Sequence, residues 1–180
     1  TTSQKQITAT TTDTEIVEFL KNNSKRLYDS KDGRHYTIYD DDLLARIKEL
    51  GLYGSYSHTK FIPTRYKMAS VEDRFALIQG LMDSDGYADS RRSSVGLTTT
   101  SKKLAEDIQE VIWSLGGMCT ITQKATSYKK DGVRIECKNA YVLYIQTADN
   151  AKLFRLDRKA SKVKARRFSK TRRIVKVEKV

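Results

Sequence analysis

The chain has 180 residues, 38% of them hydrophobic, and a formal net charge of +12, which suits one compact domain or two small halves that share a core. No apolar run approaches the roughly 20 residues of a membrane-spanning helix, and the N-terminal TTSQKQITATTT lacks the pattern of a signal peptide, so we expect an intracellular, cytoplasmic protein. The two cysteines and two histidines have no zinc-ligand spacing and give no indication of a zinc site or a disulfide framework.

Two stretches of the chain share one pattern, in which a threonine-rich strand is followed by a helix N-cap and an amphipathic helix. Residues 7–22 have Asp13 at the N-cap position, and residues 95–117 have Ser101 there. This order predicts two similar α/β halves rather than one continuous fold. After each helix come two strand-like runs joined by a Lys-Asp-Gly turn and then a further helix: strands 25–30 and 34–40 with helix 41–51, and strands 119–128 and 133–147 with helix 149–156.

The spacing of the repeat bears on where the first half begins. The threonine triplets start at Thr10 and Thr98, so the copies are 88 residues apart. A counterpart of Asp85 would then fall before Thr1, and we expect the first copy of the helix that ends at Asp85 to precede this sequence. The chain divides into three parts: residues 1–69, an N-terminally incomplete first half; residues 70–165, the second half with that helix; and residues 166–180, a basic C-terminal segment.

Between the two copies, the segment ALIQGLMDSDGY at residues 76–87 reads as an apolar helix that ends in two aspartates and a glycine. Ala76, Gly80 and Ser84 put small side chains on one stripe, which lets a second helix approach closely. Two such helices would bring their aspartates together, and these carboxylates repel unless a divalent cation binds them. The ordinary alternative is an Asp-Gly turn after a helix. An EF-hand loop is excluded, because its twelfth position would be Arg92 instead of glutamate.

The basic residues are concentrated toward the C-terminus. Residues 152–180 contain thirteen Lys and Arg against two acids, which accounts for +11 of the net charge of +12. Apolar residues alternate with these charges, a pattern that favours a structured surface over a disordered tail. Such a surface predicts a polyanionic partner, DNA or RNA.

The segment IQGLMDSDG at residues 78–86 resembles the LAGLIDADG motif of homing endonucleases, and its departures are conservative except at Gln79, where the motif has alanine. The segment KFIP at residues 60–63 resembles the lysine-x-isoleucine-proline element that precedes the second such motif in the endonuclease domains of inteins. With the paired threonine-rich strands, the resemblance covers nearly the whole chain. It implies an α/β (α+β) class, the LAGLIDADG homing-endonuclease fold, with two similar α/β halves whose saddle-shaped antiparallel sheets pack around a central helix pair.

The resemblance assigns roles to the end of the motif helix. In this family the last aspartate of each motif binds a divalent metal, Mg²⁺ or Mn²⁺, and this residue is Asp85 here. The preceding Ser84 would contribute its backbone carbonyl to the metal. Asp83 would cap and hold the helix end, which is a structural role.

The resemblance also implies two catalytic lysines. The first-half lysine matches Lys60, which would lie near the metal-bound water and stabilise charge at the phosphate, with a simple phosphate contact as the alternative. The second-half lysine matches Lys159, with Lys162 as the substitute, in the segment LDRKASKVK.

The function that the resemblance implies is that of an intein-encoded, site-specific DNA endonuclease that makes metal-dependent double-strand cuts. Its partner is double-stranded DNA, lying across the strands. The first motif's aspartate has no counterpart in this sequence, so an N-terminal fragment or a second copy would complete the active site, and inactivity of the chain alone stays open. The alternative is a LAGLIDADG-type regulator or maturase that binds DNA or RNA without cleavage. The candidate DNA-binding residues are Lys5, Arg34, Tyr36, Arg91, Arg92, Lys124, Tyr128, Arg134, Lys138 and Tyr141.

The last nine residues, RRIVKVEKV, resemble the strand with which an intein's C-terminal splicing segment resumes after its endonuclease insert. A splicing domain also needs a nucleophile at its start and a His-Asn end, and this sequence has neither. If the parent is an intein, the chain therefore carries the mobility function and not the splicing chemistry.

Overall fold

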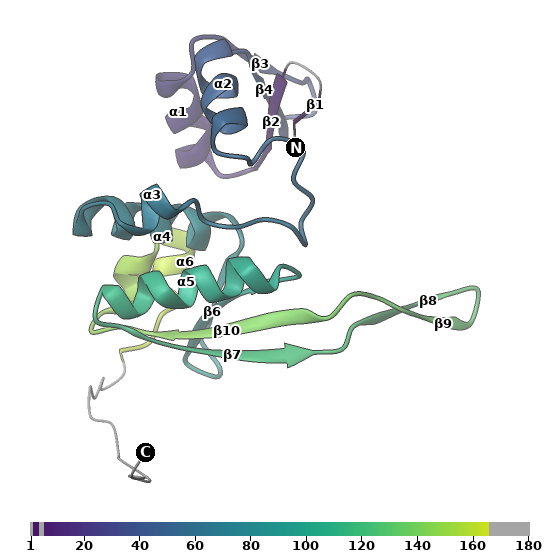
Figure 1. The fold of residues 1–180 in the computed structure, drawn as a ribbon, viewed down its shortest axis with the longest axis vertical. Coiled ribbons are helices and arrows are strands. Elements are labelled where there is room, and N and C mark those ends of the chain that lie inside the picture. Colours follow the sequence, from purple (N-terminus) through teal and green to yellow (C-terminus); the bar gives the residue numbers. More distant parts are fainter. Residues whose placement is uncertain (1, 4–5, 166–180) are drawn as a thin grey trace, which may run out of the picture.

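The computed structural model describes residues 2–3 and 6–165, whose strands form two four-stranded antiparallel sheets and one two-stranded ribbon (Figure 1). The first sheet has the strand order β1-β2-β4-β3 and the second the order β5-β6-β10-β7. In each sheet the strand that leads into a helix, β2 or β6, lies second, so the sheets share one topology. The first sheet and its helices are β1 (Thr2–Ser3), β2 (Gln6–Thr10), α1 (Thr14–Asn23), β3 (Leu27–Asp29), β4 (His35–Ile38) and α2 (Asp41–Glu49).

The short helix α3 precedes the second half, which begins with the motif helix α4. Helix α5 and the segment after the last strand lie over the same face of its sheet as α4 (Figure 1). The elements from α3 onward are α3 (Thr64–Lys67), α4 (Val71–Ser84), β5 (Gly86–Asp89), β6 (Ser94–Thr99), α5 (Lys102–Ser114), β7 (Met118–Lys124), β8 (Ser127–Lys130), β9 (Val133–Glu136), β10 (Ala140–Gln146), the 3-10 helix η1 (Asn150–Leu153) and α6 (Asp157–Ala160).

The second sheet has one buried and one exposed face. Ser101 is the N-cap of helix α5, and its hydroxyl accepts a hydrogen bond from the amide of Leu104 in the first turn. The helix buries Ile108 and Ile112 against Leu97 and Leu143 of the sheet. Because side chains alternate along a strand, the neighbouring strand residues point to the opposite face. That face carries exposed side chains from three strands: Thr98, Thr120, Thr122 and Tyr144.

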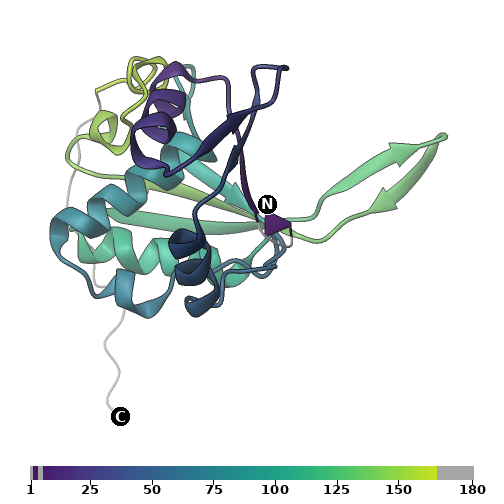
Figure 2. The ribbon, with the colours of Figure 1, turned by 90° about the horizontal axis from the view of Figure 1, so that it is seen from above.

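A ribbon projects from the far end of β7 and β10 (Figure 2). The expected strands 119–128 and 133–147 are each interrupted, and the chain beyond the breaks pairs separately as β8 and β9. The ribbon turns at Asp131 and Gly132, which have φ of 50° and 80°, the left-handed values of a two-residue hairpin turn. We call residues 125–139 the arm.

Two local expectations are corrected by the structure. The expected helix 149–156 is only the 3-10 helix η1, because Phe154 is extended with φ −121° and ψ 137°, and a separate one-turn helix α6 follows. The strand β5, directly after the motif helix, was not expected. The proposed splicing-domain strand in residues 166–180 lies outside the described residues, and the division into residues 1–69 and 70–165 stays a prediction. In the part that the structure describes, no helix has the length and apolar character to cross a membrane.

Candidate active site and nucleic-acid interface

Helix α4 delivers the acidic end of the motif. Ser70 is its N-cap, and the Ser70 hydroxyl accepts a hydrogen bond from the amide of Asp73 at 3.1 Å. The helix buries Ile78 and Met82 in the core of the second half. At the other end the amide of Asp85 donates to the carbonyl of the residue four positions earlier at 3.0 Å, and β5 begins with the next residue. The Asp85 side chain is exposed there. The motif thus ends a buried helix with a carboxylate in solvent.

Gly86 lets the chain after Asp85 pass close to the backbone of Met82. A Cβ on Gly86 would lie 2.6 Å from the carbonyl oxygen of Met82 and 2.7 Å from its Cα, closer than real side-chain atoms approach backbone. We therefore expect Gly86→Ala to lower the free energy of unfolding by about 2 kcal/mol, since the backbone must shift to fit the methyl group. Urea denaturation of the chain measures this. Gly80→Ala is the control: nothing lies within 4 Å of its added Cβ, and a helical Gly→Ala change is expected to stabilise by about 0.5–1 kcal/mol. Equal stability of Gly86→Ala and the wild type would contradict the close packing.

Asp83 has the structural role that the motif predicts. Its side chain is only 8% exposed, and its carboxylate accepts hydrogen bonds from the amides of Arg155 at 3.0 Å and Leu156 at 3.2 Å. These amides lie at the start of α6, whose N-cap residue, Leu156, has no side chain that can accept a hydrogen bond from the first turn. Asp83 therefore ties the motif helix to the segment before α6 and is not available as a metal ligand.

Lys159 lies in a different setting from the one expected of a catalytic lysine. Its side chain is 8% exposed, and Nζ donates to the carbonyl oxygens of Met82 at 2.9 Å, Asp83 at 2.6 Å and Gly86 at 2.8 Å, with that of Ser84 at 3.4 Å. Burial lowers the pKa of the Lys159 ammonium, and nearby carboxylates, that of Asp85 among them, act in the opposite direction. The ammonium is fully engaged by the end of α4, so a direct phosphate contact would require it to leave these carbonyls.

Lys162, the substitute for Lys159, is exposed beyond the end of α6. Its backbone amide donates to the carbonyl of Lys159 at 3.2 Å. Its side chain makes no hydrogen bond or ion pair with the described residues. It is thus sterically free to reach a phosphate, in contrast to Lys159.

The KFIP segment is held in place by α5. The hydroxyl of Ser101 donates to the carbonyl of Lys60 at 2.6 Å, and the amide of Ile62 donates to the buried carboxylate of Asp107 at 3.0 Å. The Lys60 side chain is exposed. Within residues 2–3 and 6–165, no hydrogen bond or ion pair joins Lys60 to Asp85, so the structure by itself does not bring these two predicted catalytic residues together.

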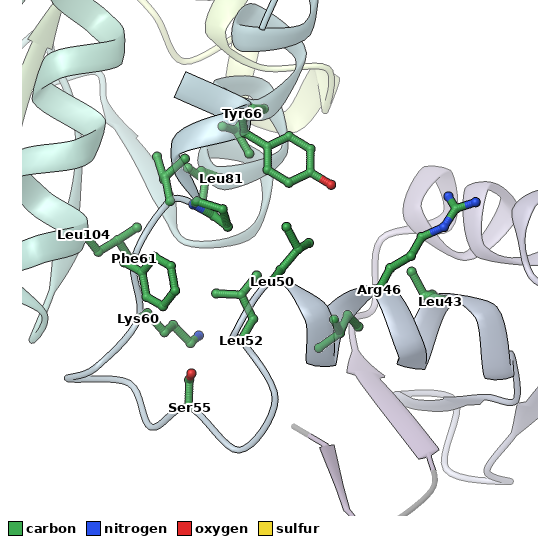
Figure 3. A pocket seen from close by; sticks show the side chains of 14 residues that line it. Leu43, Arg46, Leu50, Leu52, Ser55, Lys60, Phe61, Tyr66, Leu81 and Leu104 are labelled. Carbon is green, nitrogen blue, oxygen red and sulfur yellow. The ribbon is translucent and has the colours of Figure 1, made fainter. Parts of the chain in front are cut away.

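An apolar groove of about 600 Å³ opens beside α4, toward α2 and the KFIP segment (Figure 3). Leu77 and Leu81 of α4 line it and are half-buried. Gly80, on the side of α4 next to Leu77, is exposed and has no heavy atom within 4 Å of an added Cβ. The side of α4 with the small residue therefore lacks a packed neighbour among the described helices. The rest of the apolar wall is formed by Leu43, Ile47, Leu50, Leu52, Phe61, Ile62, Pro63 and Leu104.

The oxygen donors at the end of α4 fit a shared Mg²⁺ site. The Asp85 carboxylate accepts no hydrogen bond from the described residues, and the carbonyl of Ser84 is only loosely engaged by Lys159 at 3.4 Å. Among the same residues no three His, Cys, Asp or Glu side chains are grouped as metal ligands. Mg²⁺ at phosphate-transfer sites takes one or two protein carboxylates and completes its shell with water and phosphate oxygens. Asp85 and Ser84 therefore suit one part of such a site and not a closed cage.

The predicted DNA-binding residues fall into two groups. Two of them are corrected: Tyr36 is only 4% exposed in the core of the first half, and Tyr141 is half-buried against the core on the helix-covered side of its strand. Aromatic rings at those positions supply apolar packing, which outweighs their suitability for base contacts. Lys5 lies outside the described residues. The exposed members are Arg34, Arg91, Arg92, Lys124, Tyr128, Arg134 and Lys138.

Further exposed residues at this surface were missed from sequence. Lys129 and Lys130 lie on the arm beside the predicted Tyr128, and Tyr144 is 44% exposed on the outer face of the second sheet. The alternation of side chains along β10 marks Tyr144 as outward-facing once Leu143 is assigned to the core. Tyr144 lies three residues after Tyr141 on the same strand and therefore points to the opposite, exposed face.

Two comparisons bear on the fold. Residues 72–157 match a protein-family model described as a LAGLIDADG-like domain. Among solved structures, the chain is similar to the homing endonuclease I-DmoI in complex with DNA and Ca, with a TM-score of 0.51 and 16% identity, over 87% of this chain and 81% of that one. At this identity the likeness establishes the fold.

Curated proteins match over part of their length. The replicative DNA helicase DnaB of Mycobacterium intracellulare is 34% identical over 131 residues, 73% of this chain and 21% of that protein. The ATP-dependent DNA helicase Hel308 of Methanocaldococcus jannaschii is 36% identical over 81 residues, 43% of this chain and 7% of that protein. An iron–sulfur cluster assembly SufBD family protein of Mycobacterium leprae is 30% identical over 105 residues, 56% of this chain and 12% of that protein. The chain thus spans about a fifth or less of these relatives.

The sequence resemblance and the expected fold class are confirmed by these findings. The motif residues 78–86 lie inside the matched domain, and the two sheets with helices on one face agree with the fold of the solved relative. Residues 72–157 match the model of a LAGLIDADG-like domain, and the chain has the fold of the homing endonuclease I-DmoI.

Proposed function

We propose that the chain is part of a site-specific DNA endonuclease that makes metal-dependent double-strand cuts. The observation that carries this proposal is the position of Asp85, an exposed carboxylate at the end of a LAGLIDADG helix whose flank opens into an apolar groove. The solved relative described in complex with DNA and Ca supports double-stranded DNA as the partner and a divalent cation as the cofactor.

The chemistry of this site would be shared between the protein and Mg²⁺ or Mn²⁺. Asp85 would hold the metal through its carboxylate, and Ser84 through its backbone carbonyl. When bound, such a metal activates water for attack on a phosphodiester and neutralises phosphate charge. Asp85 remains exposed for this task because Lys159 and Asp83 satisfy the surrounding backbone. The exposed ammonium of Lys60 would contact the phosphate after DNA binds.

The groove beside α4 accommodates a second helix of the same kind. Leu77 and Leu81 offer apolar contact in the groove, and the exposed Gly80, on the side of α4 next to Leu77, lets a helix backbone approach closely. We assign the groove to a second motif helix, contributed by an N-terminal fragment or by a second copy of the chain. Its terminal carboxylate would lie beside Asp85, and the metal would relieve the repulsion between the two.

The exposed face of the second sheet and the arm together suit a DNA duplex. The arm carries Lys129 directly opposite Arg134, and Tyr128 opposite Ile135. Like charges in cross-strand register are unfavourable in water, and a phosphate between them removes that cost. A two-stranded ribbon also has the width that the major groove admits. These residues support the arm as a DNA-contacting element.

An intein is the parent that we propose. The relatives named as helicases and as an iron–sulfur assembly protein have unrelated activities, yet all share sequence with this chain over a small part of their length. A segment shared by proteins with unrelated activities is expected if the segment is a mobile insertion. It is not expected if the segment takes part in the helicase activity or in iron–sulfur cluster assembly. The KFIP element and the C-terminal RRIVKVEKV are in keeping with this origin. An insertion that acts on DNA would work inside the cell.

The test of the proposed function is a binding and cleavage assay with the complete endonuclease, meaning this chain together with whatever supplies the first motif. In Mg²⁺ we expect specific cleavage of a long duplex that contains the target. DNA affinity should fall by about 10³-fold between 50 and 200 mM salt, because phosphate contacts by Lys and Arg release counterions. Fluorescence anisotropy measures this fall. A flat salt response would remove DNA as the partner.

A DNA- or RNA-binding module without cleavage is the second candidate. The observation that favours it is that residues 1–180 contain one motif helix, so one acidic end is present in the sequence. Salt-sensitive binding without any Mg²⁺-dependent cleavage by the complete protein would establish this alternative.

A further inference from the structure

The one-turn helix α6 is hydrogen-bonded to the end of α4 through the side chain of Lys159. The side chain of Lys159, in its last turn, enters the space below the C-terminus of α4 and is 8% exposed. A helix C-terminus leaves carbonyl oxygens without intrahelical donors, and a cation there is stabilising. Lys159 supplies both the charge and the hydrogen-bond donors.

The carbonyls that Lys159 binds lie on both sides of Asp85 in the chain. Asp83 precedes Asp85 and accepts at 2.6 Å, while Gly86 follows it and accepts at 2.8 Å. A single ammonium thus fixes the backbone before and after the exposed carboxylate. The direction in which the Asp85 side chain leaves the helix end depends on these peptide groups.

The contact is reciprocal along α4. The Asp83 carboxylate accepts from the amides of Arg155 and Leu156, just ahead of α6. One turn earlier, Gln79 donates to the carbonyl of Lys152 at 2.8 Å and accepts from the guanidinium of Arg155 at 2.9 Å. Gln79 stands where the motif has alanine, and an alanine could not form these two hydrogen bonds.

Helix α6 is also anchored on its other side. Arg158 forms a two-pronged ion pair with Asp13 at the start of α1, and Arg158 Nη2 lies 2.7 Å from the carboxylate. This contact lowers the pKa of Asp13 through the hydrogen bond from Arg158. Lys159 is therefore presented from a helix that is held by both halves of the molecule.

We propose that Lys159 is a positioning residue, which fixes the Ser84 carbonyl and the Asp85 carboxylate for metal binding and does not contact the phosphate. The metal in this inference rests on the proposed function, whereas the hydrogen bonds of Lys159 to the end of α4 do not depend on it. It assigns the segment 152–159 as the support of the active-site end. Of the two candidate lysines in this segment and after it, only Lys162 is left exposed for DNA.

The first readout needs neither metal nor DNA. In Lys159→Met of the full chain, hydrogen exchange at the Asp85 amide is expected to quicken by at least about tenfold relative to amides in the middle of α5, because the last turn of α4 loses its cap. Ile112→Ala is the matched control. It removes a fully buried core side chain of α5 and lowers global stability without a selective effect at Asp85. NMR-detected exchange measures both variants.

The second readout is the Mg²⁺ dependence of cleavage by the complete endonuclease. Lys159→Met is expected to raise the Mg²⁺ concentration for half-maximal cleavage by about tenfold, with metal-free DNA affinity unchanged, whereas Ile112→Ala leaves the Mg²⁺ dependence unchanged. Asp83→Asn is a second variant, for use if Lys159→Met does not fold, and should change both readouts in the same direction.

Two results would overturn the inference. One is unchanged exchange at Asp85 in Lys159→Met or Asp83→Asn. The other is a large fall in the maximal cleavage rate of Lys159→Met with the half-maximal Mg²⁺ concentration unchanged, which identifies a lysine that acts on the phosphate. A wild-type protein that cleaves no DNA in Mg²⁺ refutes the proposed function, and the exchange measurement then decides the positioning role alone.

Discussion

Replacing Asp85 by asparagine is expected to reduce Mg²⁺-dependent cleavage by the complete endonuclease at least about 10³-fold, with DNA affinity in the absence of metal nearly unchanged. The substitution keeps the size of the side chain and removes its charge. The side chain is exposed and makes no hydrogen bond with the described residues, so the fold does not depend on it. Single-turnover cleavage and a metal-free binding titration measure the two quantities separately.

The matched control is Glu72→Gln at the other end of α4. Glu72 is also an exposed carboxylate on this helix, in its first turn. Its loss is expected to leave cleavage within about twofold of the wild type, because a charge change on the same helix then lies away from the proposed metal. Cleavage by Asp85→Asn at the wild-type rate would refute the metal assignment.

Asp107→Asn is expected to lower the free energy of unfolding by about 3 kcal/mol, the largest effect on stability that we predict. The Asp107 side chain is fully buried and accepts from Lys103 at 2.5 Å, Lys67 at 3.0 Å and the amide of Ile62 at 3.0 Å. An amide cannot balance two ammonium groups, and Lys67, 11% exposed, would keep its charge with one partner fewer. Urea denaturation measures the loss.

The control is Glu110→Gln, which removes the other partner of Lys67. The Glu110 side chain is 52% exposed, and exposed ion pairs contribute at most about 1 kcal/mol. The ratio of the two effects tests whether burial makes Asp107 important. If both variants lose the same small amount, the buried carboxylate is not the anchor that the geometry indicates.

The same residue sets the acid side of the stability profile. Burial raises the pKa of Asp107, but the hydrogen bonds from Lys103, the Ile62 amide and Lys67 outweigh burial and hold the pKa below its usual value of 3.8. A carboxyl with a lowered folded-state pKa stabilises the fold above 3.8, and this contribution is lost as the pH falls through the folded-state pKa. The wild type should therefore lose stability below about pH 4 more steeply than Asp107→Asn.

The local pattern of the sequence predicted the parts that short-range rules determine. The helix cap at Ser101, the motif helix and the Lys-Asp-Gly turns follow from residue types and spacing over a few positions. Asp13 occupies the N-cap position of α1, but its carboxylate pairs with Arg158 and makes no capping hydrogen bond. The structural role of Asp83 was implied by the resemblance to the motif. The partner amides of that carboxylate, 72 and 73 positions away, did not follow.

The sequence does not predict the surroundings of a side chain where these depend on contacts with residues distant in the chain. The resemblance assigns Lys159 a catalytic role, and this stays a prediction; the sequence gives no indication that the side chain lies under the end of α4, because the carbonyls that it binds are 73 to 77 positions away. Asp107 was overlooked because its partner at Ile62 is 45 positions away. Tyr36 and Tyr141 were assigned to the wrong face, since aromatic residues suit both a core and a DNA surface. The burial of the side chain distinguishes a core residue from a surface residue, and the alternation of residues along a strand predicts burial only weakly.

The separation of the arm from the core has a consequence for how such proteins diversify. Residues 125–139 pair with each other beyond the interrupted strands, and nearly all of their side chains are exposed. Substitutions there cost little folding energy, because they remove no core packing. The end of α4, by contrast, is tied by buried bonds to two other segments. If the proposed function holds, sequence drift on the arm would alter which nucleotide sequences are recognised and leave the residues that hold the metal unchanged.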